Sequence, residues 1–214
     1  MRRFVLVFLA VVCLADLRAE DPSIVWTRRI AGGDGKYIGW PTVTRLRSGE
    51  VVIVFSGDRQ EHVCPWGKIQ IVRSTDGGET WTKPQTIVND LIDDRDAGLL
   101  ELPDGKQLLF YFTSLAFAEQ NYANYWKSHP EWREHLLKLG DEAERQKGSW
   151  VRISEDGGKT WGERISTEIQ SPHGAIRLRD GRLFMLGLRP DKPKWRYFAA
   201  ESRNCGKTWS LVTE

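Results

Sequence analysis

The sequence predicts an all-β chain of about three similar four-stranded units, with a helical segment inserted in the second unit. Three observations predict this fold. One eight-residue motif occurs three times, a second motif precedes each copy, and the chain is rich in turn-forming and aromatic residues, with 20 Gly and 10 Trp. Motifs that recur at intervals of a few tens of residues are typical of repeat architectures, so the repeats define the units.

The first motif has the form S-x-D/N-x-G-x-T-W and occupies residues 74–81, 154–161 and 202–209. Its Asp or Asn side chain can accept hydrogen bonds from the backbone N–H groups that follow, and its glycine can take a positive φ. The tryptophan can then pack over the turn. These residues suit a tight hairpin between two strands.

The second motif occupies residues 45–55, 101–111 and 177–187. Each copy reads as a strand, a Ser-Gly or Asp-Gly turn, and a strongly apolar strand. Together the two motifs give a four-stranded meander, which is the blade of a β-propeller. The second and third copies of the first motif are one normal blade apart, whereas the first and second copies are separated by a longer stretch.

The extra residues are 115–147, and they are expected to form a helical insertion in the second blade. Ser128 and Pro130 can start a helix, in which Trp132, Leu136 and Leu139 share one face. Such a helix either packs on the propeller or stands in solvent without a functional role.

Residues 1–19 have the pattern of a secretory signal peptide. Arg2 and Arg3 precede an apolar run over residues 4–14, and cleavage is expected near Ala19. The alternative is a buried N-terminal strand. Residues 20–214 would then form the propeller part of a secreted or periplasmic protein, and an oxidising compartment would allow Cys64 and Cys205 to form a disulfide.

Composition and motifs argue against several classes of function. The net charge of +2 gives no electrostatic footprint for nucleic acid. No apolar segment is long enough to predict a membrane span. Phosphate-binding loops, nucleophile elbows and dinucleotide fingerprints are absent from the sequence, and no cofactor is expected.

Charged residues gather where the first strand of each unit begins or the second ends. The cluster Asp93-Asp94-Arg95-Asp96 is not explained by core packing, and such clusters shift carboxyl pKa values toward those of general acids and bases. A solvated loop with ion pairs is the alternative. The residues predicted to be catalytic are Asp94, Asp96, Glu61 and His62.

Because the strands of successive blades converge on the propeller axis, these residues are expected to share one concave face with substrate-binding residues. The residues predicted to bind substrate are Arg59, Arg95, Trp40, His173 and Arg189. Trp40 is either an aromatic platform for a sugar or a blade-core residue. The histidines and aspartates could instead bind a divalent metal, but their spacing matches no compact metal motif, so no metal is predicted. Asp76, Asp156 and Asn204 are expected on the opposite rim.

The three copies of the first motif resemble the Asp-box (BNR) repeats of the sialidase, or neuraminidase, superfamily, over residues from about 37 to the C-terminus. The resemblance implies part of a six-bladed propeller of the kind found in secreted glycoside hydrolases, with the boxes on the rim away from the active site. It also implies a carbohydrate substrate.

The resemblance to the sialic-acid signature is partial. Sialidases have Tyr-Arg-Ile-Pro where this chain has Tyr37-Ile38-Gly39-Trp40-Pro41, so Gly39 stands at the position of a substrate-binding arginine. Arg59 looks like the next family arginine, and Cys64 falls at the acid/base aspartate. Three arginines bind the carboxylate of sialic acid in that family, so the loss of one favours a neutral or differently charged sugar.

The sequence therefore predicts an exo-acting glycoside hydrolase, similar to exo-α-sialidases, whose sugar specificity is open. The alternative is a non-catalytic carbohydrate-binding or interaction propeller. Because the later blades of the family have no counterpart in these residues, the propeller is expected to be incomplete. A longer chain or a partner would supply the remaining blades, and the three blades alone would be prone to aggregation and inactive.

Overall fold

The computed structural model describes residues 26–119, 121, 123–191 and 194–213, and it confirms the predicted all-β architecture. The signal peptide predicted for residues 1–19 and its cleavage site near Ala19 lie outside the described residues. No helix in the described ranges is long and apolar enough to cross a membrane. Cys64 is buried and Cys205 is exposed, and both are free thiols rather than a disulfide.

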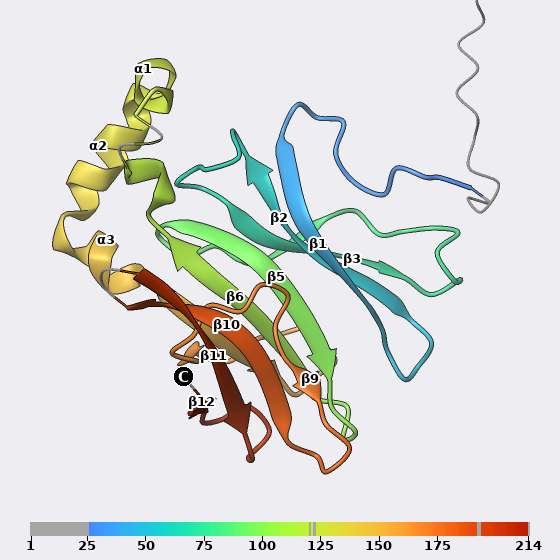
Figure 1. Ribbon diagram of the computed structural model, residues 1–214. Coiled ribbons are helices and arrows are strands. Elements are labelled where there is room, and N and C mark those ends of the chain that lie inside the picture. The colour runs from blue at the N-terminus through green and yellow to red at the C-terminus, as the bar shows by residue number, and fades with distance from the viewer. Residues whose placement is uncertain (1–25, 120, 122, 192–193, 214) are drawn as a thin grey trace, which may run out of the picture.

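Three four-stranded antiparallel sheets follow one another along the chain, and each is a meander whose strands pair in chain order (Figure 1). The first blade contains β1 (Tyr37–Arg45), β2 (Val51–Arg59), β3 (Lys68–Ser74) and β4 (Gln85–Val88). The second contains β5 (Asp93–Glu101), β6 (Gln107–Ser114), β7 (Gly148–Ser154) and β8 (Ile165–Ser166). The third contains β9 (Ile176–Arg177), β10 (Leu183–Asp191), β11 (Lys194–Ser202) and β12 (Ser210–Thr213).

Each repeated box forms the predicted hairpin turn between the third and fourth strands of its blade. In the first box, Ser74 Oγ accepts a hydrogen bond from the N–H of Gly78 at 2.9 Å. Asp76 Oδ1 accepts one from the N–H of Thr80 at 2.9 Å, and the indole N–H of Trp81 donates to the carbonyl of Gly78. The serine and Asp or Asn bonds recur in the other two boxes.

The apolar core lies between neighbouring blades. One cluster joins Val54 and Ile71 of the first blade to Leu109 of the second, and another joins Phe110 of the second blade to Met185 of the third. Box tryptophans complete both clusters, since Trp161 packs on the first and Trp209 on the second. Stacking of blade faces around an axis is the packing of a β-propeller.

Strand register places the three boxes at one end of the blades. Ser74 pairs with Val51 at the start of β2, and Ser154 and Ser202 hold the same position in their blades, opposite Gln107 and Leu183. Arg59 lies at the other end of β2, and the charged cluster of β5 lies at that same end, because Asp93 pairs with Ser114. As predicted, the box residues are on the rim opposite the charged cluster.

The insertion in the second blade is helical and packed, not solvated. It lies between β6 and β7 and contains η1 (Ala116–Ala118), α1 (Tyr125–Ser128), α2 (Pro130–Leu139) and α3 (Asp141–Gln146). Pro130 opens α2, as expected from its fixed φ and missing N–H. The indole of Trp132 is fully buried in an apolar cluster with Phe117, Cys64 and Ile92, so the insertion covers the first blade as well as the second.

We expect Trp132→Ala to destabilise the fold by about 3–5 kcal/mol, because it empties a fully buried site in that cluster. The matched control is Leu137→Ala on the same helix, where the side chain is 71% exposed and the change should stay within about 0.5 kcal/mol. Urea unfolding followed by tryptophan fluorescence and circular dichroism measures both. Equal stability of the two variants would contradict a packed insertion.

Candidate functional site

Two β-bulges shape the axial end of the first two blades. The register of β1 shifts between Gly39 and Thr42, and that of β5 shifts between Arg95 and Gly98. Each bulge contains a non-glycine residue with a left-handed backbone, Trp40 (φ 54°) in β1 and Asp96 (φ 50°) in β5. Trp40 precedes the end of β1 by as many residues as Asp96 precedes the end of β5. Bulges redirect side chains, so the two blades present these residues at equivalent points.

A buried ion network joins the two blades beneath the bulges. The guanidinium of Arg59 binds Asp93 through two bonds, NH1 to Oδ1 at 2.5 Å and NH2 to Oδ2 at 2.9 Å. The guanidinium of Arg95 approaches the same carboxylate at 3.5 Å. Burial raises the pKa of Asp93, and the two guanidinium groups oppose that rise. Gly67 leaves the space for this pair, because a Cβ there would collide with both Arg59 and Asp93.

Trp40 lies above the two arginines. Its ring is 4.3 Å from the guanidinium carbon of Arg95 and 5.1 Å from that of Arg59, which are cation–π distances. The imidazole of His62 stands edge-on to the same ring at 5.1 Å and contacts the hydroxyl of Tyr37 through Nδ1 at 3.3 Å. Partial burial and the neighbouring arginines lower the pKa of His62, so its imidazole is neutral at pH 7.

Asp96 is a second carboxyl group in this region, and its charge acts on the imidazole of His62. Its Oδ1 is buried and has no hydrogen-bond partner among the described residues. Burial raises the pKa of Asp96, while Arg95 and His173 act to lower it. The backbone N–H of His173 donates to the Asp96 carbonyl at 3.4 Å, and its Nδ1 contacts Thr42 Oγ1 at 2.6 Å. Thus His173 contacts both the first and the second blade beside Asp96.

The segment that leads into the third blade comes close to β5, and this close approach depends on Gly98. A Cβ at this position would collide with the backbone carbonyl of His173. His173 itself has a left-handed backbone (φ 69°). The sequence predicted that Trp40, Arg59, Arg95, Asp96 and His173 lie on one face, and the structure brings these five together with His62.

Three other predicted site residues have partners of their own. Asp94 points to the opposite side of β5 from Asp93, because successive residues of a strand face opposite sides. Its Oδ2 accepts a hydrogen bond from the N–H of Asp90 at 2.9 Å. Glu61 turns toward the insertion, 3.6 Å from Nε2 of His129. Arg189 lies over the ring of Phe198, at 5.9 Å. The side chains of Asp94 and Glu61 therefore turn away from the shared face, and the expectation for these two was wrong; the role of Arg189 stays a prediction.

Arg59 reaches the face but is not available to a ligand. Its side chain is 0% exposed, and besides Asp93 it donates to the backbone carbonyls of Glu61 and His62. Cys64, at the position of the family acid/base residue, is buried in the apolar cluster under the insertion. Arg59 therefore holds the site together, while Arg95, at 9% exposure, borders open space.

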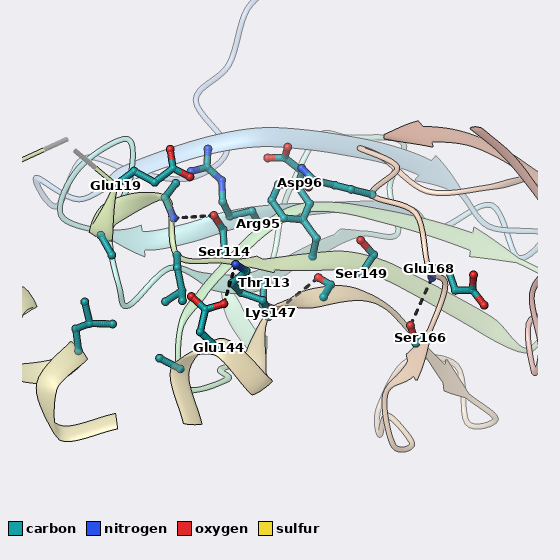
Figure 2. Close-up of a pocket in the computed structure, with 18 of the residues that line it drawn as sticks. Arg95, Asp96, Thr113, Ser114, Glu119, Glu144, Lys147, Ser149, Ser166 and Glu168 are labelled. Carbon is teal, nitrogen blue, oxygen red and sulfur yellow. Dashed lines mark hydrogen bonds and ion pairs between the residues drawn. The ribbon is translucent and has the colours of Figure 1, made fainter. Parts of the chain in front are cut away.

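A cavity of about 940 Å³ opens beside Arg95 and Asp96 (Figure 2). Figure 2 shows Glu144 and Lys147 of the insertion across the cavity from these two residues, with Ser166 and Glu168 on a third side. Most of the residues that line the cavity were not predicted from the sequence, because a cavity wall contributed by an insertion has no local motif. The excess length of the second blade was the one sequence signal that pointed to such a wall. In the ranges that the structure describes, no group of His, Cys, Asp or Glu residues is arranged to hold a metal ion.

Comparison with known families and structures supports the fold. Residues 72–83, which include the first box, match the BNR/Asp-box repeat. The chain thus carries an Asp-box repeat and has the fold of a partial β-propeller. No curated protein matches it at a significant level.

Several solved structures share the fold of this Asp-box chain. A protein of unknown function from Dyadobacter fermentans has a TM-score of 0.64 at 24% identity, covering 86% of this chain and 56% of its own. A Hadza microbial sialidase has a TM-score of 0.58 at 19% identity, covering 81% and 37% respectively. A family 117 glycoside hydrolase from Zobellia galactanivorans has a TM-score of 0.55 at 12% identity, covering 83% and 56%. The chain thus spans about half or less of the length of these structures.

Asp93→Asn should destabilise the protein by about 3–5 kcal/mol, because it leaves the guanidinium of Arg59 buried without a countercharge. The matched control is Asp58→Asn, which removes a partly exposed partner of Lys68 and should cost no more than about 1 kcal/mol. Equilibrium unfolding in urea at pH 7 compares them. A similar small effect for both would show that the ion network is not needed for the fold.

Asp94→Asn should stabilise the protein at pH 7.5 by on the order of 1 kcal/mol and have little effect at pH 4. Burial and the Asp90 carboxylate raise the pKa of Asp94 well above its usual range, so the folded state binds a proton that the unfolded state releases. The free energy of unfolding of the native protein therefore falls as the pH rises from the ordinary aspartate pKa through the raised pKa of Asp94. The variant has no carboxyl group at this position and does not show this fall. Urea unfolding at both pH values measures it.

The control for Asp94→Asn is Asp104→Asn in an exposed turn, where hydrogen bonds from Lys106 lower the pKa of the carboxyl. That variant should show no gain in the free energy of unfolding at pH 7.5. A gain in stability for both variants, or for neither, would contradict the assignment of the pH-dependent loss of stability to Asp94.

Proposed function

We propose that this propeller acts on carbohydrate, and that the cavity beside Arg95 and Asp96 is its sugar-binding site. The observation that carries the proposal is that two residues lining the cavity, Arg95 and Asp96, each have a buried polar atom, Nε and Oδ1 respectively, without a partner among the described residues. Buried polar groups are normally hydrogen-bonded, so these two atoms are suited to the hydroxyl groups of a ligand. The glycoside hydrolases among the structural neighbours support the same class of ligand.

The reaction that fits best is glycoside hydrolysis with Asp96 as the general acid. Burial raises the pKa of Asp96, which keeps the carboxyl protonated over more of the pH range and able to donate to the leaving oxygen. Hydrolysis needs a second group to attack or to activate water. Glu119 and Glu168 line the cavity without an ion-pair partner among the described residues, whereas Glu144 is paired with Lys147 at 2.9 Å.

Sialic acid is a poor substrate in this proposal. Gly39 stands at one arginine position, and Arg59 is buried against Asp93, which leaves Arg95 as the available cation of the shared face. A carboxylate sugar that needs three arginines would be bound weakly. We therefore favour an exo-acting hydrolase that releases a neutral sugar. Residues 1–19 would direct its secretion.

A second candidate is a propeller that binds carbohydrate without hydrolysing it. Asp94 and Glu61 favour this alternative, because both predicted partners of Asp96 turn away from the cavity. The two candidates share the ligand and differ in turnover.

The experiment compares the full-length protein and its Asp96→Asn variant on a panel of aryl glycosides that includes sialosides. We expect release of a neutral sugar, a loss of about 10²–10⁴-fold in kcat for the variant, and weak or absent sialoside hydrolysis. The exposed-turn variant Asp104→Asn is the control and should keep full activity. Binding without turnover would favour the second candidate, and efficient release of sialic acid would contradict the proposed specificity.

A further inference from the structure

The walls of the cavity differ in chemistry. One wall, from β5, carries the charged groups Arg95 and Asp96, and a second carries the polar side chains of Ser149, Ser166 and Gln170. The third side comes mainly from the insertion and combines apolar residues with the charged residues Glu119, Glu144 and Lys147. Its apolar part is here called the apolar wall and consists of Phe112 near the end of β6 and, from the insertion, Leu115, Ala116, Ala118, Leu136 and Ala143.

The apolar wall is not merely the surface of a core. Leu115, Ala116, Ala118 and Leu136 are only half-buried, although they adjoin a cluster in which Trp132 and Phe117 are completely buried. Methyl groups and a leucine side chain thus remain open to the cavity. An apolar surface that stays accessible inside a concave site favours an apolar ligand group.

The apolar wall is held rigidly in place. The indole N–H of Trp132 donates to Gln60 Oε1 at 2.6 Å, and the imidazole of His135 contacts the backbone carbonyl of Leu91 at 2.8 Å. Both contacts tie α2 to segments that lead into the site, since Gln60 follows Arg59 and Leu91 precedes Asp93. The wall therefore keeps a fixed position relative to Arg95 and Asp96.

The cavity also has more room than one sugar ring needs. Its volume of about 940 Å³ lies near the upper end of the range of small-molecule sites, about 300–1,000 Å³. A sugar ring lying against Arg95, Asp96 and the polar wall leaves the space beside the insertion for whatever is attached to that sugar.

We propose that the cavity takes a glycoside with an apolar aglycone: the sugar lies against β5 and the polar wall, and the aglycone packs on the apolar wall. This inference rests on the proposed function and adds the class of substrate. Hydroxyl groups of a second sugar that faced the side chains of the apolar wall would be buried without partners, which is unfavourable, whereas an aryl or alkyl group loses nothing there. The insertion thereby determines specificity, and Leu136 is its central specificity-determining residue.

The test measures dissociation constants of the full-length protein for phenyl and methyl glycosides, in both anomers, of glucose, galactose, fucose and N-acetylglucosamine, with lactose and cellobiose as disaccharide probes. For the sugar that binds, we expect the phenyl glycoside to bind at least about tenfold more tightly than the methyl glycoside. Disaccharides should show no such gain.

Leu136→Asn should reduce the preference for the phenyl glycoside over the methyl glycoside by about tenfold. The matched control is Leu137→Asn, the neighbouring residue on α2, whose side chain is 71% exposed and which should keep the preference. Ala118→Leu, which fills the cavity from η1 without introducing a polar group, is the second variant and should weaken the phenyl glycoside selectively.

The outcomes separate the two proposals. Equal affinity for phenyl and methyl glycosides, tighter binding of a disaccharide, or a preference that survives both Leu136→Asn and Ala118→Leu would overturn the apolar-aglycone site while leaving sugar binding intact. Failure of every glycoside and disaccharide to bind the native protein would overturn the proposed function itself.

Discussion

The carboxylate of Asp93 is the point on which the axial end of this propeller depends. It binds Arg59 from the end of β2 and Arg95 from its own strand, so one buried anion holds two cations from two blades. Removing such charges from water is costly, and pairing with good geometry is what makes their burial tolerable. Arg59 also binds the backbone carbonyls of Glu61 and His62, which extends the network into the loop that leads to β3.

The functional groups are arranged on top of this network. Trp40 stacks on both arginines, and it is held in a left-handed conformation that is unfavourable for a large side chain. Asp96 and His173 have left-handed backbones as well. Backbone strain of this kind persists where the surroundings fix the conformation, and here it occurs beside the unpartnered polar atoms of Arg95 and Asp96.

The insertion links stability to the shape of the site. Trp132 buries its ring in the cluster that contains Cys64, and the same helix presents Leu136 to the cavity. A loop inserted into a repeat is free to vary without disturbing the blades, which is how propellers acquire different pockets on a common frame. In this chain the insertion covers the place where the family resemblance implied an acid/base residue, and it contributes a wall that the blades themselves do not have.

Sequence patterns determined the blades, the box turns and the helix of the insertion, because these features depend on residues near each other in the chain. Ser74, Asp76 and Trp81 make a hairpin through local bonds, and Pro130 begins a helix through its own ring. Only the tertiary structure decided which member of the Asp93–Asp96 cluster serves which purpose. Consecutive strand residues face opposite sides and a bulge of one residue reverses that order, so Asp93 lies in the ion network, Asp94 lies beside Asp90, and Asp96 borders the cavity. The cavity wall, too, arises from contacts between segments that are distant in sequence, which no local pattern records.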